Sequence, residues 1–262
     1  MFDKSIPAKR PHRLPSAIAL TSGVIATAMA LSVAAVMTVA YAPAAFADDA
    51  VTSEAGRIAR GGRLYDKWYK VIGAEKPADT HAAWPASNDK KSGDTTWRCK
   101  SCHGWDYLGK DGAYATGSYQ TGILGINKFD GADTAAIVAV LKDDLHALDG
   151  LMDDGDFEDL ALFVSKGQID LDTYVDRASK APKGDGAKGQ ALFETACVNC
   201  HGVDGTKVKD MDPLGDLMGN PWEIMHKIRF GQPDEDMPAL FVFDPQIAAD
   251  IMAYSATLPK ER

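Results

Sequence analysis

The pentapeptide Cys-x-x-Cys-His occurs twice in this chain of 262 residues and uses all four of its cysteines. The residues of the two copies are Cys99, Cys102, His103, Cys197, Cys200 and His201. Two thiols at this spacing can bond to the two vinyl groups of one haem, and the adjoining histidine can then bind the iron. The pattern is typical of covalent c-type haem, so two copies predict two haems.

Paired cysteines also occur in zinc sites and in redox-active dithiols. Cys102 and Cys197 lie 95 residues apart, and a zinc site made of two cysteine pairs needs no histidine directly after each pair. A thioredoxin-like dithiol requires a βαβ context, which surrounds neither motif. The haem interpretation is therefore favoured over zinc binding or disulfide chemistry.

The first 47 residues have the pattern of an export signal. Four basic residues precede an uncharged stretch at 17–40, and Ala45-Phe46-Ala47 is a small-x-small cleavage sequence. The uncharged stretch is also long enough to span a bilayer, so an uncleaved membrane anchor is the alternative. Both versions place the remainder outside the cytoplasm, and we expect a periplasmic protein.

Net charge limits the partners of the exported part. The full chain carries −9, and the first 47 residues carry +3, which leaves −12 for the rest. Such a protein should repel nucleic acid and anionic lipid. A redox partner with a basic docking patch is expected instead, and between Asp143 and Asp159 eight acidic residues occur without a lysine or arginine.

Helix signals predict an all-α fold with a repeated plan. In the second half, helices are expected at 188–196, from Asn220-Pro221 to Phe230, and from Asp244-Pro245 onward, where cap residues precede proline. In the first half they are expected at 134–145 and 156–165. The predicted domains are 52–168 and 186–260, with an insertion at 70–96 and a linker at 169–185.

The second module resembles a class I c-type cytochrome domain, and the whole chain resembles a tandem diheme cytochrome c. The segments that carry the likeness are Gly189…Phe193, Cys197-x-x-Cys200-His201-Gly202, Pro213-Leu214, Met237-Pro238 and the closing Ala253-Tyr254. The resemblance implies two domains of a few short helices, each around one covalent haem. It covers residues 186–260 closely and the first module more loosely.

The resemblance also implies roles for single residues. His201 would be the proximal ligand of the second haem, and Met237 would be the distal thioether ligand. The carbonyl of Pro213 would accept the other imidazole proton of His201. Phe193 would pack between the first and last helices of the module.

The first haem has His103 as its expected proximal ligand, whereas its distal ligand is less constrained. Met152 is the only methionine between residue 48 and the predicted linker, and it lies between two predicted helices as Met237 does. His146 is the rival, His81 in the insertion is a more distant one, and an open sixth position is a further alternative. The segment 122–125 can replace the Pro-Leu of the second module.

The expected function is single-electron transfer between periplasmic redox partners, as a carrier or as the haem subunit of a dehydrogenase or oxidase. No side chain is expected to perform acid, base or nucleophilic chemistry. The alternative is a haem enzyme, peroxidase-like or oxidising sulfur compounds, or a gas-binding protein with an open first haem. Known thiosulfate-oxidising diheme cytochromes use a distal cysteine, and all four cysteines of this chain lie in the two motifs.

Overall fold

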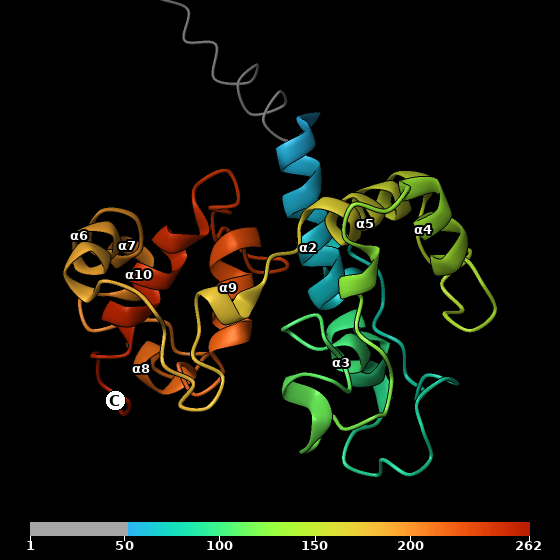
Figure 1. Cartoon of the computed structure of the whole chain (residues 1–262), viewed down its shortest axis with the longest axis horizontal. Helices are drawn as coiled ribbons and strands as arrows, with labels where there is room; N and C mark the ends of the chain where they lie inside the picture. The colour runs from blue at the N-terminus through green and yellow to red at the C-terminus, as the bar shows by residue number, and fades with distance from the viewer. Residues whose placement is uncertain (1–51) are drawn as a thin grey trace, which may run out of the picture. The chain divides into compact units, whose positions relative to one another are not determined.

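The computed structural model describes residues 52–262, which belong to one compact unit. The helices are α2 (Glu54–Val71), α3 (Cys99–His103), α4 (Thr134–Leu141), α5 (Asp154–Lys166), α6 (Gly186–Ala196), α7 (Val198–His201), α8 (Leu214–Leu217), α9 (Pro221–Phe230) and α10 (Pro245–Ser255). Within residues 52–262 no strand forms, and the only β-pairing is two isolated bridges, Gly109 with Leu124 and Val175 with Pro182. The described part is therefore all-α, as predicted (Figure 1).

The predicted export signal at 1–47 lies outside the described residues. Among the helices of residues 52–262, none is both long and apolar enough to cross a membrane.

The same helix pair occurs twice, because α2 packs on α5 and α6 packs on α10. Each crossing depends on a glycine. A Cβ atom at Gly61 would lie 2.0 Å from the backbone oxygen of Asp159, and one at Gly189 would lie 1.8 Å from that of Asp250. These distances are far below any real contact, so only glycine lets the backbones approach so closely.

The glycine crossings also set the register of the repeat. Gly61 is the true counterpart of Gly189, and four residues later Tyr65 corresponds to Phe193, both buried. Phe193 packs against Tyr254 of α10 with ring centres 5.3 Å apart, as the resemblance implied. Gly62 has another role, since its missing Cβ makes room for the Phe230 ring of α9.

The two Cys-x-x-Cys-His motifs also fold alike. Each forms one helical turn, α3 or α7, which ends at a glycine with positive φ, +83° at Gly104 and +81° at Gly202. Both glycine N–H groups donate to the backbone oxygen four residues earlier, at 3.0 Å and 2.8 Å. This left-handed ending favours glycine and turns the chain sharply after each histidine.

The helix predictions for the second module agree closely with the structure. Helices α9 and α10 begin at Pro221 and Pro245, and the Asp244 side chain accepts a hydrogen bond from the Gln246 backbone. In the first module α4 ends at Leu141, four residues earlier than expected, and the chain then turns through residues 143–148.

The segment expected to be a linker, 169–185, packs against the rest of the unit. Leu171 and Val175 are buried in the common hydrophobic core. Arg177 forms an ion pair with the buried carboxylate of Asp106 at 2.6 Å. Apolar residues within a stretch rich in Lys, Asp and Gly hold the segment down, so it does not form a loose tether.

Helix α2 connects the two halves, because it packs on α9 as well as on α5. Asp66 of α2 is buried and forms ion pairs with Arg98, next to the first motif, and with Lys227 of α9. The ring of His226 in α9 is buried. Its Nε2 donates to the Gly62 carbonyl at 2.9 Å, and its Nδ1 accepts from the Tyr107 hydroxyl at 2.9 Å. These polar contacts fix the position of the first motif against both halves.

Candidate functional site

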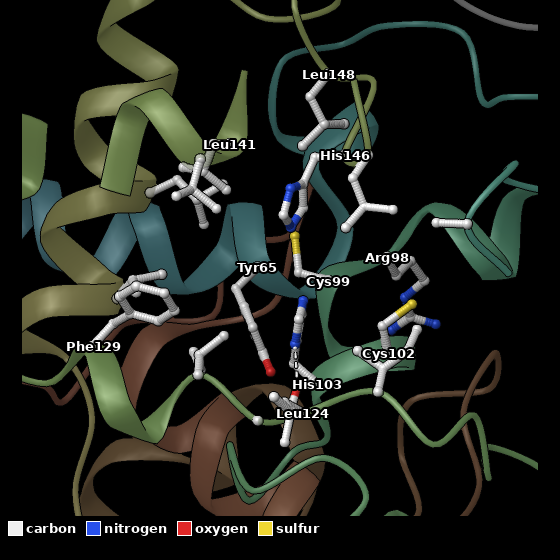
Figure 2. A pocket seen from close by; sticks show the side chains of 18 of the residues that line it. Tyr65, Arg98, Cys99, Cys102, His103, Leu124, Phe129, Leu141, His146 and Leu148 are labelled. Carbon is white, nitrogen blue, oxygen red and sulfur yellow. Dashed lines mark hydrogen bonds between the residues drawn. The ribbon is translucent and has the colours of Figure 1, made fainter. Parts of the chain in front are cut away.

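A cavity of about 390 Å³ lies next to the first Cys-x-x-Cys-His motif. Cys99, Cys102 and His103 form part of its wall, and His146 forms another part (Figure 2). The apolar lining includes Tyr65, Leu124, Ile126, Phe129, Ile137, Leu141, Leu148, Leu160 and Val164. Helices α2, α4 and α5 supply most of these side chains, so the repeated helix pair positions the cavity above the motif.

His103 is oriented by a single hydrogen bond. Its Nδ1 donates to the backbone oxygen of Leu124 at 2.7 Å, and burial lowers the pKa of the ring below its ordinary value. A neutral ring that donates through Nδ1 keeps the lone pair of Nε2 free. This is the arrangement in which histidine binds a metal ion.

The Leu124 carbonyl is brought to His103 by a close backbone pairing. Lys110 N donates to the Ile123 oxygen at 2.8 Å, and Ile126 N donates to the Tyr107 oxygen at 2.8 Å. A Cβ at Gly125 would lie 2.1 Å from the Tyr107 oxygen, so the pairing requires glycine there. The segment 122–125 thus supplies the orienting carbonyl, as the sequence indicated.

His146 faces His103 across the cavity (Figure 2). The two ring centres are 6.3 Å apart, and the ring planes differ by 22°. The Nδ1 of His146 lies 2.9 Å from the Asp143 carboxylate, which leaves Nε2 directed away from that contact. Histidine nitrogens bind metals at about 2 Å, so two imidazoles on opposite sides of one metal ion have ring centres about 6 Å apart.

Met152 lies between α4 and α5, as the sequence predicted. It is buried in the hydrophobic core, and it is not among the residues that line this cavity. It directly precedes Asp153, which caps α5 through a reciprocal pair with Asp156, and an apolar residue at that position commonly packs against the helix start. Because α4 ends early, the following turn presents His146 to the cavity, and Met152 as the distal ligand stays a prediction.

The four cysteines are free thiols, and none is engaged in a disulfide. Burial raises the pKa of Cys99 and Cys102 to about 12, so both are neutral, unlike the thiolates of zinc and redox sites. Across residues 52–262, no group of three His, Cys, Asp or Glu side chains is arranged to hold a metal ion.

His201 of the second motif has a buried Nδ1 atom without a hydrogen-bond partner, and burial lowers the pKa of its ring. The predicted bond to the Pro213 carbonyl is not formed in this structure. Pro213 is the cap of the short helix α8, and its oxygen accepts from the N–H groups of Asp216 and Leu217 at 2.9 Å and 3.1 Å. The Pro213 carbonyl, which was predicted to bond to His201, is therefore used by the first turn of α8.

Met237 lies half-buried in the loop between α9 and α10. It lines a second, open cavity of about 730 Å³ together with residues of α2 and of the loop at 232–239, and His201 is not in that lining. Met225 and Met252 are fully buried in helices, which agrees with their interpretation as core residues. The structure thus brings His103 and His146 together at one cavity, whereas the cavity that Met237 lines does not include His201.

Asp143 was not foreseen as a contributor to the first site, and His81, expected only as a distant candidate for the distal ligand, contributes through a different contact. Asp143 holds the Nδ1 of His146, and the only sequence signal is its i, i+3 spacing from that histidine. His81 of the insertion contacts the His146 backbone, a relation between distant segments that no local pattern indicates.

Comparison with known proteins gives one match. Residues 184–254 match the family described as cytochrome c oxidase, cbb3-type, subunit III. The comparisons found no match among curated proteins and none among solved structures. Residues 184–254 are accordingly a class I c-type cytochrome domain, which implies covalently bound haem and supports an electron-transfer haem protein.

Proposed function

We propose that this chain is a periplasmic diheme cytochrome that passes single electrons between redox proteins, as a carrier or as the haem subunit of a larger system. Residues 184–254 supply one cytochrome domain. The proposal of a second domain is supported by the repeated helix pair, the repeated glycine crossing and the identical capping of α3 and α7. The single observation that carries it is the His103–His146 pair across an apolar cavity beside two cysteines.

In the first module, Cys99 and Cys102 would bond covalently to the haem, and His103 and His146 would bind its iron. The bound haem would supply the reversible ferric–ferrous couple. The chain's own contribution is to hold both imidazoles through Leu124 and Asp143, and to exclude water with the apolar wall. Rigid ligands of this kind keep the iron environment similar in both oxidation states, which favours rapid electron transfer.

In the second module, Cys197, Cys200 and His201 would hold the haem, and Met237 would be its distal ligand. The proposal is supported by the family match, by the buried and unpartnered Nδ1 of His201, and by the core positions of Met225 and Met252. A methionine ligand raises the reduction potential relative to a second histidine. The two haems would therefore differ in potential, with the second one higher.

The enzyme and gas-sensor alternatives both need an available position on the first iron. His146 would take that position, and its ring is already oriented by Asp143. Electron transfer is therefore the favoured class.

The partner is proposed to be a redox protein with a basic docking patch. Much of the acidic run at 143–159 is neutralised internally, since Arg60 pairs with Asp156 and Asp159, and Lys142 pairs with Asp154. The remaining exposed carboxylates include those of Asp144 and Asp149. Together with the exposed Asp153, these carboxylates would place the docking charge at residues 143–153, next to the first cavity.

A potentiometric titration of the purified full-length haem protein, followed by carbon monoxide addition to the reduced form, tests this function. Two one-electron steps at separate potentials, with no rapid carbon monoxide binding, are expected. A single haem per chain, or rapid stoichiometric binding at one iron, would overturn the proposal.

A further inference from the structure

We propose that His81, from the insertion at 70–96, positions the distal side of the first haem site by clamping the loop that carries His146. The inference rests on the proposed function, because it assumes that His146 is a haem ligand. The carrying observation is the contact of the His81 Nε2 atom with the backbone oxygen of His146 at 2.9 Å. Residues 81 and 146 are 65 positions apart, so this contact closes the site across a long stretch of chain.

The tautomer of His81 is determined by its second contact. The backbone N–H of Ala83 donates to the His81 Nδ1 atom at 3.0 Å, so Nδ1 must carry the lone pair. The Nε2 atom then carries the proton and donates to the His146 carbonyl. Both ring nitrogens are used, and the imidazole cannot turn without losing both hydrogen bonds.

The segment that carries His81 is itself anchored to the proximal side of the cavity. The His81 ring packs edge-on against Trp97, with centres 4.4 Å apart, and Trp97 lies two residues before Cys99. The His81 N–H donates to the buried Thr96 hydroxyl at 2.9 Å. The indole of Trp97 donates to the Asp79 backbone oxygen at 2.8 Å.

His81, Thr96 and Trp97 all line the cavity, together with His103 and His146. The insertion therefore forms a wall that connects the covalent motif with the distal loop. A loop that only served a partner would not need this inward set of contacts. As a consequence of these contacts, His146 should leave the iron rarely, because the loop that carries it must first break the hydrogen bond between His81 and the His146 carbonyl.

The rate at which carbon monoxide associates with the fully reduced, full-length haem protein measures how often His146 leaves the iron. His81→Phe keeps an aromatic ring against Trp97 and removes the donor, whereas His81→Gln keeps a donor at a similar reach. The net contribution of one hydrogen bond corresponds to roughly a fivefold change in an equilibrium constant. We expect about fivefold faster association in His81→Phe, a rate near the wild-type value in His81→Gln, and no change in Lys76→Ala, an exposed site in the same insertion.

His146→Ala provides the reference for an open site. It separates the proposed clamp by His81 from the proposed ligation of the iron by His146. If His146→Ala binds carbon monoxide rapidly while His81→Phe behaves as wild type, the clamp is wrong and the axial pair stands. Equal acceleration in His81→Phe and His81→Gln would also overturn the clamp, because a general loosening would then explain both. Rapid binding by the unmodified protein would overturn the clamp and the axial pair together.

Discussion

The imidazole rings of His103 and His146 lie nearly parallel across an apolar cavity, with centres 6.3 Å apart. Each ring has its Nδ1 engaged by an oxygen, from the Leu124 carbonyl for His103 and from the Asp143 carboxylate for His146. Orientation by a second contact of this kind is what metal-binding histidines generally show. The relationship is specific to the first module, because the buried Nδ1 atom of His201 has no hydrogen-bond partner.

Replacing His146 and Met152 separately should distinguish the two candidate ligands. His146→Ala is expected to open one iron per chain, so that carbon monoxide binds the reduced protein stoichiometrically. Met152→Leu conserves the volume of a buried side chain and should cost less than about 1.5 kcal/mol without changing the haem spectrum. Absorption and electron paramagnetic resonance spectra of both variants provide the measurement, and a loss of low-spin signal in Met152→Leu alone would reverse the assignment.

Removing the charge of Asp143 should raise the reduction potential of the first haem. The carboxylate beside Nδ1 makes the His146 ring a stronger donor, which stabilises ferric iron. Asp143→Asn keeps a hydrogen-bond acceptor without the charge, and the potential should rise by roughly 30–60 mV, where about 59 mV is a tenfold change for one electron.

The neighbouring carboxylate of Asp144 provides the control for potentiometry. Asp144 is exposed and does not contact the His146 ring. Its replacement by asparagine removes the same charge from the same loop. Equal shifts in the two variants would mean that the effect is a general surface potential, and the specific role of Asp143 would be refuted.

Met237→Leu should abolish thioether ligation at the second haem. The potential of that haem should fall, and the methionine–iron charge-transfer band of the ferric protein should disappear. Met211→Leu, in the loop after His201, is the matched control because Met211 is also half-buried outside the core helices. A band that survives in Met237→Leu and vanishes in Met211→Leu would transfer the role to Met211.

Much of the fold followed from local signals, and the exceptions have physical reasons. Cap-and-proline pairs located α9 and α10 because those signals act within one turn. The early end of α4 was missed because the hydrogen bonds that the Asp143 carboxylate accepts from His146 compete with further helix, and sequence periodicity does not register them. The choice of His146 over Met152 depends on that turn, and the role of His81 depends on a contact between distant segments. Long-range geometry, unlike motif chemistry, could not be deduced from the chain alone.

The two glycine crossings should be intolerant of any side chain. In Gly61→Ala and Gly189→Ala the new Cβ would lie about 2 Å from a backbone oxygen of the partner helix, so the helices must separate. We expect each variant to lose on the order of 2–4 kcal/mol in the free energy of unfolding, measured by denaturant titration.

Gly155 is a helical glycine without such a neighbour, since its nearest atom is the Asp153 carboxylate at 3.4 Å. Gly155→Ala should therefore leave stability unchanged or raise it by up to about 1 kcal/mol, because alanine is the better helix former. If Gly61→Ala and Gly155→Ala behaved alike, the close approach of α2 and α5 would not be a determinant of the fold.

Asp66 should make stability depend on pH in the acidic range. Burial alone would raise the pKa of this carboxyl, but Lys227 and Arg98 hold it well below its usual range. A lowered pKa in the folded state contributes stability that is fully present above the unfolded value of about 3.9 and is lost as the pH falls below it. Asp66→Asn leaves two partly buried cations without their buried partner, so at neutral pH it should cost about 3 kcal/mol.

The difference in unfolding free energy between the unmodified protein and Asp66→Asn should therefore shrink as the pH is lowered from 7 toward 3. Asp154→Asn removes an exposed carboxylate that pairs with Lys142, and it should change stability little at either pH. A difference that stays constant with pH would show that the Asp66 carboxylate is not charged in the folded protein. The ion pairs that join α2 to Arg98 and to α9 would then not be what holds the first motif against the two halves.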